Sequence, residues 1–374
     1  MDILLMIFYA TIVLGILVFI HEGGHYLAAR AFGVRVTEFM LGLPGPSIGF
    51  TRAGTRFGVT AVPLGGYAKV CGMEAGEMSP HLEQVLAALY RRGTANMEDI
   101  AADCNITDDE AFEALDELSE WGSICGPTKK DQFNTYRAPA VQPTKKQIAR
   151  AVAAGKPSLI SYELGQARPV EDAHALFESE YKQQYRALPF WKRSVILLAG
   201  VFVNLVFAVL VFVVLYSLIG VDVTTQAGEV RHVVLNPLQS VELGFVFIGM
   251  VVQAIAGLFN PATAADTMAN SASVIGIAAM SKIAVDAGLF SALSFVASIS
   301  VSLGLMNLLP IPPLDGGRFV VEIFQKISRK VVSTKALNYM SAAGMILFLG
   351  FFLIMANQDI QGILTGSAPW MSKG

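Results

Sequence analysis

Long apolar runs alternate with polar stretches along the chain. Four runs are long and nearly uncharged, at residues 3–30, 194–219, 288–314 and 339–356. Each could cross about 30 Å of hydrocarbon as a helix. A fifth run, residues 244–259, has only sixteen residues and is ambiguous by length. The pattern predicts a polytopic α-helical membrane protein with about four transmembrane helices.

Composition supports the same fold class. The 374 residues are 53% hydrophobic and only 15% charged, whereas soluble domains carry about 25% charged residues. No basic residue precedes the first apolar run and no small-residue cleavage pattern follows it, so we expect it to be retained rather than removed as a signal peptide. Cys71, Cys104 and Cys125 are far apart, which predicts neither a zinc knuckle nor a disulfide framework.

The first polar connection begins with a β-rich region. Between residues 30 and 72, β-forming residues lie between glycine turns, and we expect strands at 57–63 and 65–70. This compact region favours a membrane-associated β-hairpin or sheet directly after the first apolar helix. Residues 1–72 are therefore interpreted as one unit.

Residues 73–190 form an insert of different character. Amphipathic helices are expected at 82–92, 97–104 and 108–121, and Thr107 precedes the third, which has acidic residues in its first turn. A hairpin would follow at 123–137.

The insert thus predicts a small, mainly helical module. Three helices and a hairpin make residues 80–137 similar to a winged helix. A linker with one further helix, at 171–185, would follow. Residues 191–374 are the rest of the membrane core.

The first apolar run ends in the motif His21-Glu22-Gly23-Gly24-His25. Residues i and i+4 of a helix share one face, so His21 and His25 can bind one metal ion. Glu22 then lies beside the site and can act as a general base. Titratable side chains at membrane depth mark function by default. The alternative is a pair of interfacial histidines with a snorkelling glutamate.

A catalytic zinc ion usually has three protein ligands and one open position. Asp315 is the candidate for the third ligand, because it follows Pro310, Pro312 and Pro313 at the end of another apolar run. These prolines cannot continue a regular helix. Irregular backbone at membrane depth is tolerated where it lines protein or a wet cavity, so we expect Asp315 to project inward. The alternative is an ordinary helix stop at the interface.

Basic residues indicate the orientation. Nineteen Lys and Arg lie in residues 30–193, two in 220–287 and five in 318–338, so the first and third connections are expected in the cytoplasm and the N-terminus outside. His25 and Asp315 can meet only if a single crossing separates their helices. We therefore predict that residues 244–259 do not cross but lie at the interface or re-enter the membrane.

Taken together, the motifs resemble the site-2 protease family of intramembrane zinc metalloproteases. HEGGH near the N-terminus and Asn307-Leu-Leu-Pro-Ile-Pro-Pro-Leu-Asp315-Gly-Gly near the C-terminus carry the resemblance. The bacterial regulator-of-sigma-E protease branch is the most similar, on the stretches Phe32-Gly-Val-Arg-Val, Val62-Pro-Leu-Gly-Gly-Tyr-Ala-Lys69, Ala199-Gly-Val-Phe-Val-Asn204 and Ser273-Val-Ile-Gly276.

The resemblance implies roles for particular residues. His21, His25 and Asp315 would bind Zn²⁺, and Glu22 would be the catalytic base. Asn204 and Asn307 would face the site or the substrate, although an asparagine in an apolar span can also simply hydrogen-bond a neighbouring helix. The β region with Gly65, Gly66 and Tyr67 would bind an unwound substrate segment by adding a strand to the sheet.

Two features depart from the family pattern. The branch usually carries a PDZ domain after the second core span, but residues 221–242 are too short for one. The common pattern also lacks the insert at 73–190, which our orientation puts in the cytoplasm beside the active-site opening.

The charge of the insert bears on its partner. Residues 81–125 carry eleven acidic and two basic side chains, and the expected third helix has no Lys or Arg. DNA binding needs cations against phosphates, so DNA is disfavoured. Residues 126–156 carry seven basic and one acidic side chain. They could contact anionic lipid or the acidic helices, or form a solvated linker. We expect the insert to gate or recruit substrate with a protein partner.

The sequence therefore favours an intramembrane zinc metalloprotease of a bacterial cytoplasmic membrane. By resemblance, its substrates would be transmembrane proteins such as anti-sigma factors or remnant signal peptides. The alternative is a non-catalytic membrane scaffold or sensor that acts through its insert. A zinc transporter or channel would require more polar residues along several spans than this sequence has.

Overall fold

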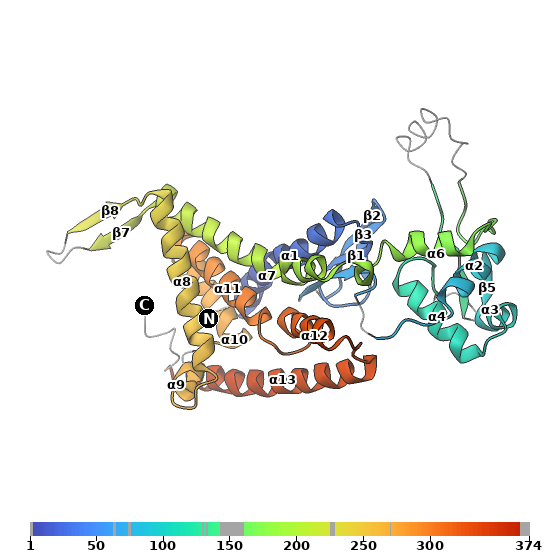
Figure 1. Cartoon of the computed structure of the whole chain (residues 1–374). Coiled ribbons are helices and arrows are strands. Elements are labelled where there is room, and N and C mark those ends of the chain that lie inside the picture. Colours follow the sequence, from blue (N-terminus) through green and yellow to red (C-terminus); the bar gives the residue numbers. More distant parts are fainter. Residues whose placement is uncertain are drawn as a thin grey trace.

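The computed structural model describes residues 3–62, 65–73, 76–128, 131, 134–142, 161–224, 229–269 and 271–366. An elongated bundle of apolar helices carries a small helical module at one end and a two-stranded hairpin at the other (Figure 1). Among the described residues, five helices are long and apolar enough to cross a membrane. These are α1 (Ile3–Ala31), α7 (Phe190–Val213, continuing as π-helix over Val214–Ile219), α8 (Pro237–Gly257), α11 (Leu289–Asn307) and α13 (Thr334–Thr365). The chain is thus a mostly helical, multi-pass membrane protein.

Helices α1, α7 and α11 form the centre of the bundle. One buried cluster joins α7 to α11 through Ala208, Val211, Ala297 and Val301. The predicted run 288–314 is helical only as far as Asn307, because the prolines from Pro310 onward end the helix. Asp315 then begins α12 (Asp315–Ser328), an amphipathic helix that the hydrophobic pattern had not suggested.

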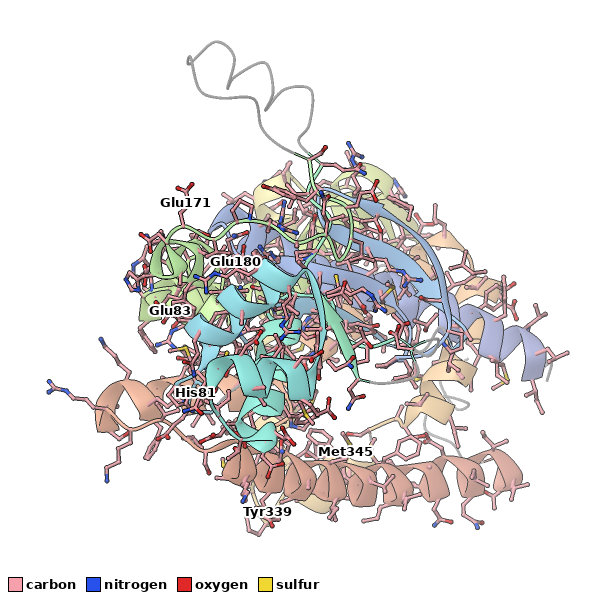
Figure 2. The ribbon with its side chains drawn as sticks, turned by 90° about the vertical axis from the view of Figure 1, so that its right-hand side faces the viewer. His81, Glu83, Glu171, Glu180, Tyr339 and Met345 are labelled. Carbon is pink, nitrogen blue, oxygen red and sulfur yellow. The ribbon has the colours of Figure 1, made fainter. Side chains whose placement is uncertain are left out.

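The ambiguous fifth run belongs to a longer helix than expected. Helix α8 begins at Pro237, and Asn236 caps it by accepting a hydrogen bond from the Gln239 amide at 2.9 Å. In Figure 1 α8 stands upright, whereas α13 lies horizontally in both Figures 1 and 2. The two axes therefore cross steeply. The short helices α9 (Ala264–Ala269) and α10 (Val274–Asp286) follow α8.

The predicted β region is a four-stranded sheet. Its strands are β1 (Val36–Leu41), β2 (Ser47–Arg52), β3 (Thr55–Thr60) and β4 (Gly66–Val70), in the order β2-β3-β1-β4. The two expected strands are both present but do not pair with each other, because β1 lies between them, parallel to β3 and antiparallel to β4. Strand β4 is therefore an edge strand, and it lies along α1.

The insert contains the three expected helices, α2 (Leu82–Arg92), α3 (Met97–Cys104) and α4 (Asp108–Glu120), and later α6 (Ala173–Tyr181). Strand β6 (Thr135–Arg137) pairs with β5 (Thr94–Asn96). Of the hairpin expected at 123–137, the described residues show one bridge, between Cys125 and Arg137. Residues 129–130, 132–133 and 143–160, which include much of the predicted basic stretch at 126–156, lie outside the described residues.

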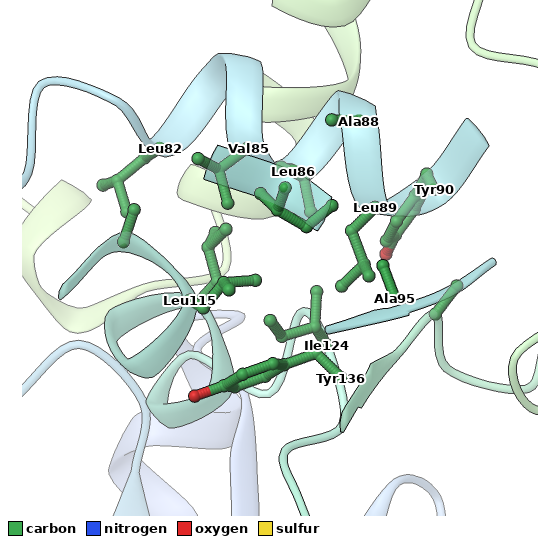
Figure 3. Packing of buried hydrophobic residues seen from close by; sticks show 14 of the residues in the cluster. Leu82, Val85, Leu86, Ala88, Leu89, Tyr90, Ala95, Leu115, Ile124 and Tyr136 are labelled. Atoms are coloured by element: carbon green, nitrogen blue, oxygen red, sulfur yellow. The ribbon is translucent and has the colours of Figure 1, made fainter. Parts of the chain in front are cut away.

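One apolar core holds the insert together. Leu82, Val85, Leu86 and Leu89 of α2 face Leu115 of α4 (Figure 3). Trp121, Ile124 and Tyr136 belong to the same buried cluster. The Thr107 hydroxyl accepts a hydrogen bond from the Glu110 amide at 3.3 Å, which caps α4 as its sequence predicts.

On the other side of the membrane helices, β7 (Val221–Thr224) and β8 (Val230–Val233) form an antiparallel pair after α7. The insert and this pair lie at opposite ends of the bundle (Figure 1). The first and second connections of the chain therefore emerge at opposite ends.

We predict that Leu115→Ala unfolds the insert without disturbing the membrane core. Leu115 is fully buried, and such a truncation destabilises by about 2–5 kcal/mol. Phe112→Ala on the same helix is the matched control, because Phe112 is 43% exposed and surface changes stay within about 0.5 kcal/mol. Hydrogen exchange of the full-length protein measures both. Equal loss of protection in the two variants would contradict the packing described.

Candidate metal centre

Two glycines let α1 and α7 approach closely enough to build the site. A Cβ atom on Gly24 would lie 2.6 Å from the Ala199 carbonyl oxygen. A Cβ atom on Gly200 would lie 2.8 Å from Nε2 of His21 and closer still to Nε2 of His25. The imidazoles of α1 therefore fill the space that any side chain at residue 200 would take.

The third group comes from the loop between α11 and α12. Gly316 and Gly317 pack against the backbone of residues 308–312, where a Cβ atom on Gly317 would lie 2.8 Å from the Ile311 carbonyl oxygen. This close folding brings Asp315, at the first position of α12, against α1. The unwinding predicted from the prolines thus delivers the carboxylate to the histidines.

Three ligand atoms converge at this point. Asp315 Oδ2 lies 3.1 Å from His21 Nε2 and 3.2 Å from His25 Nε2, and the two Nε2 atoms are 3.3 Å apart. A tetrahedral zinc ion with bonds of about 2.0–2.1 Å holds its ligands roughly 3.3 Å apart. The three atoms thus lie at the spacing of three corners of such a tetrahedron, leaving the fourth corner open.

The hydrogen bond made by Nδ1 of His25, the ring nitrogen away from Asp315, leaves Nε2 available to bind a metal ion. His25 Nδ1 donates a hydrogen bond to the Ile196 carbonyl at 2.8 Å, so in neutral His25 the lone pair is on Nε2. That lone pair faces the Asp315 carboxylate at 3.2 Å, an arrangement that a metal cation between the two groups stabilises. Both imidazoles are also more than nine-tenths buried. The donor set is therefore suited to one zinc ion.

Asn204 is the neighbour of the other histidine. Its amide Nδ2 lies 3.3 Å from His21 Nδ1, while its Oδ1 is buried with no hydrogen-bond partner among the described residues. Rotating the amide by 180° would let Oδ1 accept the His21 Nδ1 hydrogen and leave the Nε2 lone pair for a metal ion. Asn204 thus lies behind the ligand rather than in the cavity.

Glu22 points to the sheet. Its Oε2 accepts a hydrogen bond from the Ala68 amide of β4 at 2.9 Å. In an antiparallel edge strand, alternate residues direct their amide and carbonyl groups outward. Since Ala68 directs its amide toward Glu22, Gly66 and Val70 have their backbone groups on the same free edge. The carboxylate and the free edge of β4 are therefore adjacent.

A cavity of about 380 Å³ opens beside these groups. Of the residues predicted at the site, Gly65, Gly66, Tyr67 and Asn307 line it, together with His21, Glu22, His25 and Asp315. The Asn307 amide donates to the Leu303 carbonyl within its own helix at 3.0 Å, and the Tyr67 hydroxyl donates to Glu38 at 2.8 Å.

Some residues that shape or line the cavity were not singled out by the sequence interpretation. Met73 and Arg318 line the cavity, and Gly200 shapes the space for the imidazoles. The position of Arg318 three residues after the predicted ligand Asp315, one helical turn, was a usable signal. Nothing in the sequence indicated Met73.

Comparison with known proteins is consistent with this geometry. The family model described as Peptidase family M50 matches residues 9–351. A protein of Brucella suis is 26% identical over 93% of this chain and 93% of its own length. A protein of Agrobacterium fabrum is 26% identical over 94% of this chain and 95% of its own length. A protein of Campylobacter jejuni is 25% identical over 96% of this chain and 94% of its own length. All three are named putative zinc metalloproteases.

We predict that the glycines of the HEGGH motif and Gly200, which faces it from α7, differ sharply in their tolerance of substitution by alanine. Gly24→Ala and Gly200→Ala would lose zinc, because the new methyl would overlap the facing backbone or the imidazoles. Gly23→Ala is the matched control, since nothing lies within 4 Å of its added Cβ. Zinc content of the purified proteins is the measurement. Full zinc in Gly200→Ala would show that α1 and α7 do not pack as described.

Proposed function

The chain belongs to peptidase family M50 and is a membrane zinc metalloprotease, and from this premise we propose how its residues divide the work. His21, His25 and Asp315 hold the zinc ion, and Glu22 is the general base. The observation that carries the proposal is the convergence of the three ligand atoms within 3.1–3.3 Å of one another, with Glu22 next to them on α1.

Zinc bound here supplies Lewis acidity, which polarises a carbonyl and acidifies water. The protein's residues supply the rest. Glu22 takes a proton from the attacking water and returns it to the leaving amine. Ile196 and Asn204 fix the ring orientations of the two histidines. The buried site limits access of bulk water, which strengthens these electrostatic interactions.

The free edge of β4 would hold the substrate. A helical transmembrane segment conceals its peptide bonds, so it must unwind before water can attack. An extended peptide can pair with the outward-facing groups of Gly66, Ala68 and Val70. Because the Ala68 amide lies 2.9 Å from Glu22, a peptide on this edge runs past the base. The substrates would be transmembrane proteins, of the anti-sigma-factor or remnant-signal-peptide type.

The proposed topology has the N-terminus outside a bacterial cytoplasmic membrane and the metal centre near the cytoplasmic side. Phe290 near the start of α11 packs on Tyr216 near the end of α7, with ring centroids 5.7 Å apart. If α7 and α11 both cross, the chain between them starts and ends on one side. Helix α8 then cannot be the single crossing between them. Its steep angle to α13 fits a helix along the interface (Figure 1).

The insert would regulate access in the cytoplasm, with a protein partner. Arg35, just before β1, forms an ion pair with Glu180 at 2.8 Å and donates to the Gly122 carbonyl at 2.7 Å. At the same end of the sheet, where Val36 pairs with Val70, the Tyr185 amide donates a hydrogen bond to the Cys71 carbonyl just after β4. The insert thus holds both the start of β1 and the end of β4. A partner that shifts the insert would shift the substrate-binding edge.

A PDZ domain that filters substrates is not proposed for this chain. Strands β7 and β8 and the start of α8 occupy the connection after α7 in the described residues. In the absence of such a domain, the insert would control which substrates reach the site from the cytoplasm. DNA is not proposed as a partner, because α4 carries no basic side chain.

We predict that Glu22→Gln abolishes cleavage of a model transmembrane substrate while zinc stays bound. Loss of a general base lowers rates by about 10²–10⁴-fold. Cleavage by purified protein in bilayers and its zinc content are measured together. If Glu22→Gln cleaved the substrate at the wild-type rate, Glu22 would not be the general base. Absence of cleavage in the zinc-loaded wild type would favour the non-catalytic scaffold.

We also predict that Arg35→Ala uncouples the insert from the sheet. Hydrogen exchange should rise at β4 and at the end of α4, and cleavage of a membrane substrate should fall several-fold with zinc retained. Arg92→Ala is the control, because Arg92 bonds Asp103 at 2.8 Å inside the insert and not the core. Unchanged exchange at β4 in Arg35→Ala would refute the coupling.

A further inference from the structure

Arg318 is a charged side chain that lines the catalytic cavity without being one of its four catalytic groups. It lies three residues after Asp315, on the first turn of α12, and is exposed. A cation in the first turn of a helix is disfavoured by the helix dipole. Its presence there therefore calls for an explanation other than helix stability.

The natural partner of Arg318 on its own helix is engaged elsewhere. Glu322 lies one turn further on, at the i+4 position, where ion pairs form readily. Glu322 is buried and instead pairs with Arg193 at 3.2 Å and accepts from the Tyr185 hydroxyl at 3.2 Å. Within the described ranges no carboxylate pairs with Arg318. Its side chain instead contacts Met73, with Nη1 3.5 Å from Sδ.

This contact fixes the end of the cavity at which Arg318 lies. Strand β4 runs beside α1 in the same direction. A Cβ atom on Gly66 would lie 2.9 Å from Val18 Cγ1, the Ala68 amide bonds Glu22, and Val70 packs in one cluster with Ala29.

Met73 follows β4 and packs against that same cluster. Arg318 and Met73 therefore lie at the insert end of the cavity, which the proposed topology puts on the cytoplasmic side. A peptide extended along β4 advances about 3.3 Å per residue. It would thus reach Arg318 a few residues to the cytoplasmic side of the bond next to Glu22.

We propose that Arg318 determines specificity by contacting the substrate on the cytoplasmic side of the scissile bond, where it favours an acidic side chain and disfavours a basic one. The proposal rests on the proposed function, because it assumes cleavage of a peptide held along β4. Membrane proteins carry mainly Lys and Arg on their cytoplasmic flanks. A guanidinium at this subsite would therefore reject most of them by like-charge repulsion.

The test uses full-length, zinc-loaded protein in bilayers and a set of model transmembrane substrates. The cleaved bond of the substrate is mapped first. Glu, Gln or Lys is then placed, one position at a time, at the substrate residues on the cytoplasmic side of that bond. The wild type should cleave the Glu substrate about tenfold faster than the Lys substrate, in kcat/KM, at the most sensitive position. Arg318→Gln should bring this ratio close to one, and Arg318→Glu should invert it.

Lys326→Glu is the matched control, because Lys326 is an exposed cation on the same helix that does not line the cavity. It should keep the wild-type ratio and the wild-type rate on the Gln substrate, and all variants should keep their zinc. A ratio that stays the same in Arg318→Glu would overturn the proposal, as would a wild type indifferent to charge. If the wild type cleaves no substrate, the proposed function fails instead, so the two failures are distinguishable.

Discussion

The close contact between α1 and α7 is the constraint on which the rest of the structure depends. Two imidazoles on α1 occupy the space left by the missing side chain of Gly200, and Gly24 lets the helix backbones approach. Helices pack this closely in membranes mainly where small residues lie at the interface. Without that space, the histidines could not turn their Nε2 atoms toward Asp315. The metal centre is therefore a product of helix packing as much as of ligand chemistry.

The same packing connects the centre to the parts around it. His25 is oriented by the carbonyl of Ile196 and His21 by Asn204, both on α7. Glu22 on the neighbouring face bonds the edge of β4. The sheet in turn is held by the insert through Arg35. A continuous set of contacts thus runs from the insert through the sheet to Glu22, and this set gives the insert a physical route for influencing the cavity.

Much of the site could be predicted from the sequence, because its chemistry depends on spacing and on unusual positions. Two histidines at i and i+4 must share a helix face, and prolines before Asp315 must interrupt a helix. The insert helices were predictable from amphipathic pattern and the Thr107 cap. The remaining features depend on tertiary packing. The order of strands in the sheet and the packing of the imidazoles against Gly200 have no signature in local sequence. Helix α8 was underestimated because its polar first turns, which include Glu242, hid its start.

The most direct test of the central claim is X-ray absorption at the zinc edge of the purified protein. The account predicts two imidazole nitrogens and one carboxylate oxygen at about 2.0–2.2 Å. In Asp315→Ala the carboxylate contribution should disappear. A sulfur ligand at about 2.3 Å, or a zinc environment that is the same in wild type and Asp315→Ala, would contradict the claim that these three side chains hold the ion.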